Sequence, residues 1–109
     1  MNIKLPPPIA AYFAAANAHD MDTVLRCFAA EAVVHDEGQE IRGAAAIRAW
    51  KEHTDQKYSP TATPTDMAEA DGRSIVTATV SGNFPGSPLP LRYFFTLDKA
   101  GITALEIKA

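Results

Sequence analysis

The stretch "AEAVVHDEGQEIRG", residues 30–43, decides where the sheet of this protein begins. Val33 and Val34 favour a β-strand, because β-branched side chains fit a pleated surface. The letters "DEGQ" that follow supply turn-forming residues before Ile41. Residues 32–42 are therefore predicted to form a small β-hairpin.

Asp36 lies at the end of that first strand and has two interpretations. Strand alternation places Asp36 on the same face as Val34, and His35 on the opposite face, at the surface. If the face of Asp36 lines a cavity, loss of water raises the carboxyl pKa from about 3.9 toward the range of a general base. Otherwise Asp36 is a hydrated turn residue beside Glu37 and Gly38.

Three amphipathic helices are predicted around the hairpin. The first follows the prolines at 6–8, the second is capped by Asp20 or Asp22, and the third runs from Gly43 to about Lys57. The apolar residues that recur at helical spacing are Ile9, Tyr12, Phe13 and Ala16 in the first helix, Val24, Leu25 and Phe28 in the second, and Ile47 and Trp50 in the third.

The pattern changes to strands from Thr61 onward, with turn signals at 71–72, 85–90 and 99–101. Predicted strands are Ser74 to Phe84, a strand with Leu91, Tyr93, Phe95 and Leu97 on one face, and Ile102 to Ile107. The sequence thus predicts a single α+β domain, residues 1–109. In this domain three N-terminal helices cover one side of an antiparallel sheet.

Composition excludes several classes of function. The 109 residues carry a formal net charge of -3 with scattered Lys and Arg, so nucleic acid is not expected as a partner. The apolar run from Ile9 to Ala16 is far shorter than the roughly 20 residues of a membrane helix.

With Cys27 as the one cysteine and no metal-ligand spacing, neither a disulfide nor a metal or cofactor is expected. The N-terminus lacks the pattern of a secretory signal, which predicts a cytoplasmic protein.

Two tyrosines and the tryptophan are candidates for a site. Tyr12 lies on the apolar stripe of the first helix, and Tyr93 lies between Leu91 and Phe95 on the apolar face of its strand. A buried phenol needs a partner for its hydroxyl, so each tyrosine either packs in the core or faces a pocket. Trp50 can equally line a pocket or fill the core.

The order of "AYFAAANAHDMDTVLRCF", "AAEAVVHDEG" and "IRGAAAIRAW" resembles the nuclear transport factor 2-like superfamily, especially its SnoaL-like branch. This resemblance implies a cone-shaped fold. In that fold a strongly curved antiparallel sheet wraps three helices and leaves an apolar pocket at the open end. It also implies a homodimer.

The chain is similar to ketosteroid isomerases and SnoaL-type polyketide cyclases at the positions of their sites. The resemblance implies that Asp36 is a general base and Tyr12 an oxyanion-binding donor. Tyr93 stands where the isomerases carry a protonated aspartic acid, and its ring takes space that a steroid needs. Further pocket residues are then Val34, Trp50, Phe13 and Phe95.

Two functions follow as hypotheses. In the first, Asp36 removes a proton next to a carbonyl of a small apolar molecule, in an isomerisation or a ring closure that needs no cofactor. Tyr12, together with Tyr93, donates hydrogen bonds to the enolate oxygen in this hypothesis. In the second, the chain is a non-catalytic module that binds a small apolar molecule or a protein partner. If Tyr12, Asp36 and Tyr93 converge on one cavity, the enzyme hypothesis is favoured over the binding module.

Overall fold

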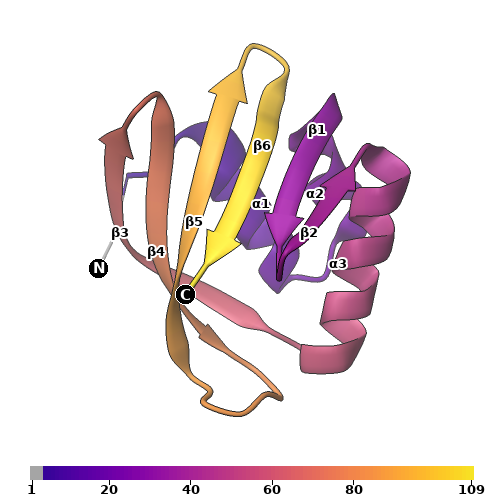
Figure 1. The fold of residues 1–109 in the computed structure, drawn as a ribbon, viewed down its shortest axis with the longest axis vertical. Coiled ribbons are helices and arrows are strands. Elements are labelled where there is room, and N and C mark those ends of the chain that lie inside the picture. Colours follow the sequence, from indigo (N-terminus) through magenta and orange to yellow (C-terminus); the bar gives the residue numbers. More distant parts are fainter. Residues whose placement is uncertain (1–3) are drawn as a thin grey trace.

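The computed structural model describes residues 4–109, which form helices on one side of a six-stranded sheet (Figure 1). No helix in this part of the chain has the length and apolar character needed to cross a bilayer. The elements are α1 (Pro7–Asn17), α2 (Met21–Arg26), β1 (Phe28–Asp36), β2 (Gln39–Arg42), α3 (Ala44–Tyr58), β3 (Thr61–Ala70), β4 (Arg73–Ser81), β5 (Leu89–Asp98) and β6 (Gly101–Lys108).

The strand order is β2-β1-β6-β5-β4-β3, which confirms the α+β prediction. One pairing differs from the antiparallel sheet that was expected. β1 and β6 run parallel, with Val34 opposite Leu105, while the other neighbouring pairs are antiparallel. Hairpin turns force consecutive strands to be antiparallel, but β1 and β6 lie at opposite ends of the chain and no turn constrains them.

The helix boundaries follow from capping groups. Asp20, rather than Asp22, caps α2, because its side chain accepts a hydrogen bond from the Thr23 backbone N–H at 3.3 Å. At the end of α3, Ser59 adopts left-handed geometry with φ 45° and donates its N–H to Asp55 at 2.9 Å.

Two strand boundaries differ from the sequence prediction by three residues or more. β1 begins at Phe28 rather than Ala32, because Phe28 pairs with Ile102 of β6 before a register shift. β4 ends at Ser81, so Phe84 lies in the β4–β5 loop and not on the strand.

Five aromatic rings form the centre of the core beneath the sheet. Tyr12 meets Phe13, Phe28 and Phe95 edge-on with ring centroids 5.4–5.8 Å apart, and Phe13 meets Tyr93 at 5.0 Å. Edge-to-face pairs contribute about 0.5–1.5 kcal/mol each beyond the burial of their area. These contacts fix the orientation of the two tyrosine rings.

The end of α1 is attached to the sheet by Asn17. Its side-chain amide donates to the carbonyl of Ala62 at 2.8 Å, and its side-chain oxygen accepts from the N–H of the same residue at 2.9 Å. Asn17 therefore pairs with β3 much as a neighbouring strand would, which sets the distance between α1 and the sheet.

Candidate functional site

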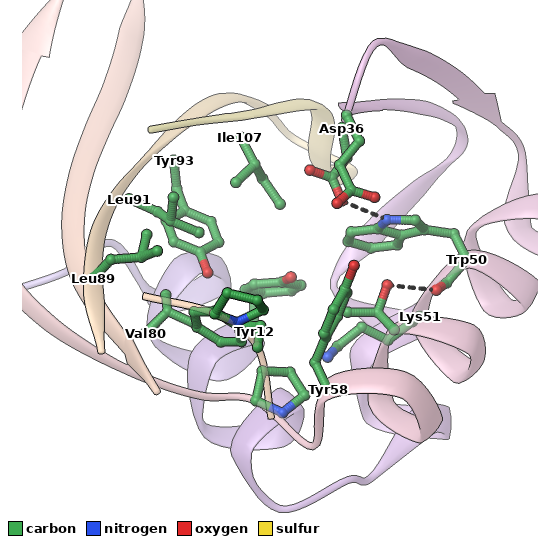
Figure 2. A pocket seen from close by; sticks show the side chains of 15 residues that line it. Tyr12, Asp36, Trp50, Lys51, Tyr58, Val80, Leu89, Leu91, Tyr93 and Ile107 are labelled. Atoms are coloured by element: carbon green, nitrogen blue, oxygen red, sulfur yellow. Dashed lines mark hydrogen bonds between the residues drawn. The ribbon is translucent and has the colours of Figure 1, made fainter. Parts of the chain in front are cut away.

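A pocket of about 290 Å³ opens between α3, the inner side of β4–β6 and the β4–β5 loop (Figure 2). Its wall is mostly apolar, and the polar groups that reach it come from α1, β1, α3 and β5. The aliphatic, proline and phenylalanine residues of the lining are Pro60, Val80, Phe84, Pro85, Leu89, Leu91 and Ile107.

Asp36 reaches this pocket from the last position of β1. Alternation along β1 buries Ala32 and Val34 on the inner face and leaves His35 exposed, so the carboxylate points inward. The indole N–H of Trp50 donates a hydrogen bond to Asp36 Oδ2 at 2.9 Å. Burial raises the pKa of Asp36 above its ordinary value, although the Trp50 hydrogen bond acts in the opposite direction.

Tyr12 and Tyr93 turn their hydroxyls into the same space as the Asp36 carboxylate (Figure 2). Their side chains are almost closed to solvent, with 3% and 6% exposure. Burial raises the pKa of Tyr12, and the neighbouring Tyr93 and Asp36 raise it further. Burial and Asp36 likewise raise the pKa of Tyr93. Both phenols consequently stay protonated and can donate hydrogen bonds.

The structure separates the other expected pocket residues into two groups. Trp50 lines the pocket together with Asp36, Tyr12 and Tyr93. By contrast, three residues expected in the wall belong to the closed core behind it: Phe13, Val34 and Phe95. The rings of Phe13 and Phe95 pack against the pocket-lining Tyr12 and Tyr93, and Val34 is fully buried in the core.

Lys51 is a pocket residue that sequence reasoning missed. It lies on α3 with 5% exposure, and its ammonium group contacts Asp55 Oδ1 at 2.6 Å. Asp55 Oδ2 also lies 3.5 Å from Nδ1 of His19. The i,i+4 spacing of Lys51 and Asp55 was a visible signal for the pair, but helical spacing alone does not reveal burial.

Further missed residues come from the C-terminal half of α3 and from the β4–β5 loop. Thr54 and Tyr58 extend the α3 wall, and Phe84 and Pro85 reach it from the β4–β5 loop. The loop lies against α3 because the N–H of Asn83 donates to the carbonyl of Tyr58 at 2.6 Å. Within residues 4–109, no three His, Cys, Asp or Glu side chains gather in a way that would hold a metal ion.

Comparison with known proteins gives one family match. The model of the SnoaL-like domain matches residues 9–103 of the chain. No curated protein sequence matches that of the chain significantly.

Among solved structures, a candidate polyketide cyclase from Sinorhizobium meliloti is similar at 38% identity over 95% of both chains, with a TM-score of 0.92. A protein from Catenulispora acidiphila with a ketosteroid isomerase-like fold, solved with trimethylamine, is 22% identical. It has a TM-score of 0.83, and the match covers 97% of this chain and 87% of that one. A candidate polyketide cyclase from Xanthomonas campestris is also 22% identical over 93% and 86% of the two chains, with a TM-score of 0.79. At such identity the last two show the fold alone.

Proposed function

The chain belongs to the SnoaL-like domain family, and on that basis we propose that it is an acid-base enzyme of isomerase or cyclase type. Its substrate is a small apolar molecule with a carbonyl group. The observation that carries this proposal is the convergence of Asp36, Tyr12 and Tyr93 on one mostly apolar pocket of about 290 Å³. A pocket of this size suits a small ring compound rather than a polymer.

Asp36 is the general base of the proposed reaction. Its ionised carboxylate takes a proton from the carbon next to the substrate carbonyl and leaves an enolate. A carboxylate with a raised pKa holds that proton more strongly than a hydrated one does, which favours the transfer. Trp50 holds Oδ2, so Oδ1 is the oxygen left to accept the proton.

Tyr12 and Tyr93 donate hydrogen bonds to the oxygen on which negative charge develops. Donors fixed in a dry site stabilise this charge more than water does, because they need no reorientation during the reaction. Their raised pKa values keep them protonated over the pH range in which Asp36 is ionised. The proposed chemistry therefore needs only groups of this chain.

The test is a screen of small cyclic ketones and 1,3-diketones for exchange of α-hydrogen with deuterium, followed by NMR. Asp36→Asn is expected to lower the exchange rate at least 100-fold, and Tyr12→Phe about 10- to 100-fold. His35→Asn is the matched control, because His35 is the exposed neighbour of Asp36 on the opposite face of β1. Full activity of Asp36→Asn on a ketone that the wild-type protein exchanges would disprove the mechanism.

Non-catalytic binding of a small organic cation is the second candidate. It is favoured by the half-buried Asp36 carboxylate among the rings of Trp50, Tyr12, Tyr58 and Tyr93, since aromatic faces and a carboxylate attract ammonium groups. The Catenulispora relative was solved with such an amine. Calorimetric titration with trimethylammonium chloride separates the candidates: saturable binding lost in Asp36→Asn, without ketone exchange, would favour the binding module.

A further inference from the structure

A second hollow of about 520 Å³ lies beside the first pocket, between α3 and the β1–β2 turn. The two hollows have five lining residues in common: Asp36, Glu37, Trp50, Thr54 and Tyr58. The two hollows therefore adjoin at these side chains. Figure 2 shows the indole of Trp50 beside the Asp36 carboxylate at this boundary.

The chemistry of the second hollow differs from that of the first. Its α3 side carries Ala46 and Ala49, whose small side chains leave the hollow open, and then His53 and Lys57. The opposite side comes from the turn and β2 and presents Glu37, Gln39 and Glu40. The second hollow is thus lined by the ammonium group of Lys57 on one side and by the carboxylates of Glu37 and Glu40 on the other. An uncharged hydroxyl or amide can donate to the carboxylates and accept from Lys57, whereas a charged group meets a like charge on one side.

We propose that this second hollow is a binding subsite for the uncharged, hydrogen-bonding tail of a ligand whose apolar carbonyl end occupies the first pocket. The subsite makes the protein select elongated amphipathic ketones over compact ones. The inference rests on the part of the proposed function that places an apolar ketone in the first pocket, and it does not depend on turnover.

Trp50 provides the signal for the test. It is the one tryptophan of the chain, so its indole N–H gives one resolved NMR resonance at the boundary of both hollows. Two ketones of equal length serve as probes, 4-pentylcyclohexanone and 4-(4-hydroxybutyl)cyclohexanone. The hydroxyl compound is expected to bind about fivefold more tightly, which corresponds to one net hydrogen bond.

Two variants locate the tail. Ala49→Leu narrows the second hollow beside Trp50 and is expected to reduce the fivefold preference while leaving the affinity for the pentyl compound within about twofold. Ala45→Leu is the matched control, because Ala45 is an exposed alanine of the same helix whose position lies outside the linings of both hollows. It should keep the full preference.

The possible results separate this inference from the proposed function. Binding of both ketones without a preference, or a preference that is undiminished in Ala49→Leu, would overturn the subsite alone. Failure of both ketones to bind would overturn the apolar ketone site and the subsite with it. Tighter binding of the matching ammonium or carboxylate analogue would overturn the uncharged tail chemistry.

Discussion

Opposing interactions set the pKa of Asp36, and this pKa affects the stability of the protein as well as its chemistry. Burial raises its pKa, the Trp50 hydrogen bond lowers it, and the neighbouring Glu37 raises it again. Since the net direction is upward, the folded protein binds the proton of Asp36 more tightly than the unfolded chain does. Ionised Asp36 therefore costs stability above the ordinary carboxyl pKa, and this cost disappears when the pH falls below it.

Asp36→Asn is expected to unfold at a higher temperature than the wild-type protein at pH 7. Asparagine carries no charge, and its side-chain oxygen can still accept the Trp50 hydrogen bond. The difference should shrink as the pH falls through about 4, because the wild-type carboxyl then becomes neutral as well. Circular dichroism melts between pH 3 and 8 measure this, with the exposed Asp66→Asn as a control for loss of charge. A lower midpoint of Asp36→Asn at pH 7 would contradict the argument.

Lys51 and Asp55 form a buried ion pair whose partners depend on each other. Removing the carboxylate in Asp55→Ala leaves an ammonium group that is 5% exposed without its partner, so a loss of about 3–5 kcal/mol is expected in urea unfolding. The double variant Lys51→Met, Asp55→Leu should recover most of this loss. The control is Glu52→Ala, which breaks the exposed pair with Arg48 at the same i,i+4 spacing and should cost at most about 0.5 kcal/mol. Equal losses in both single variants would show that burial of the pair is unimportant.

At the scale of elements, the β4–β5 loop forms one wall of the pocket only because it lies against the end of α3. Tyr58 and Phe84 meet edge-on at 5.9 Å, and the Asn83 N–H bonds to the Tyr58 carbonyl. At Gly82 a Cβ would lie 2.5 Å from that carbonyl oxygen and 3.2 Å from Cα of Pro60. Close approach of two backbones, rather than turn geometry, requires glycine at this position.

Gly82→Ala is therefore expected to push the loop away from α3. The cost should be about 1–3 kcal/mol in unfolding experiments, as for other overpacked contacts. Ligand binding should weaken as well, because Phe84 and Pro85 move with the loop. Asn83→Ala is the neighbouring control, since it removes an exposed side chain and keeps the backbone hydrogen bond. Unchanged stability of Gly82→Ala would mean that the loop is not held by this contact.

At the scale of the whole molecule, α1 and α2 lie behind the sheet and α3 lies beside β2 (Figure 1). On the outer face, Phe94 is surrounded by cationic side chains: Arg73, Arg92 and Lys108 lie 4.7, 5.6 and 5.8 Å from its ring centroid. Their stems and the partly exposed Ile75 give this face an apolar centre with a charged rim, as in many protein interfaces.

We predict that two copies pair through this outer face of the sheet, in keeping with the homodimer expected from the sequence. Phe94→Lys should then convert a dimer to a monomer in sedimentation velocity, because it adds a further positive charge beside Arg73, Arg92 and Lys108 at the centre of the interface. Gln56→Glu, on the exposed side of α3, is the control and should leave the dimer intact. A wild-type protein that sediments as a monomer at high concentration would disprove the prediction.

The sequence by itself determined most of the elements and their faces, although Phe28, expected on the second helix, begins β1. Helical spacing around Ile9 and Ile47, and strand alternation around Val34 and Tyr93, depend on local geometry that a short window of residues contains. Alternation also places Asp36 on the face of Val34, which could be predicted from the sequence, whereas the choice between a pocket carboxylate and a hydrated turn residue could not.

Contacts between distant segments were decided by the tertiary structure alone. The parallel pairing of β1 with β6, the burial of Lys51, the position of Phe84 in a pocket wall and the depth of Phe13 and Phe95 all depend on which segments pack together. Local propensity does not distinguish a pocket wall from the layer behind it, because both are apolar positions on the same face of an element. Only packing against the facing element determines which side chain meets empty space and which meets another side chain.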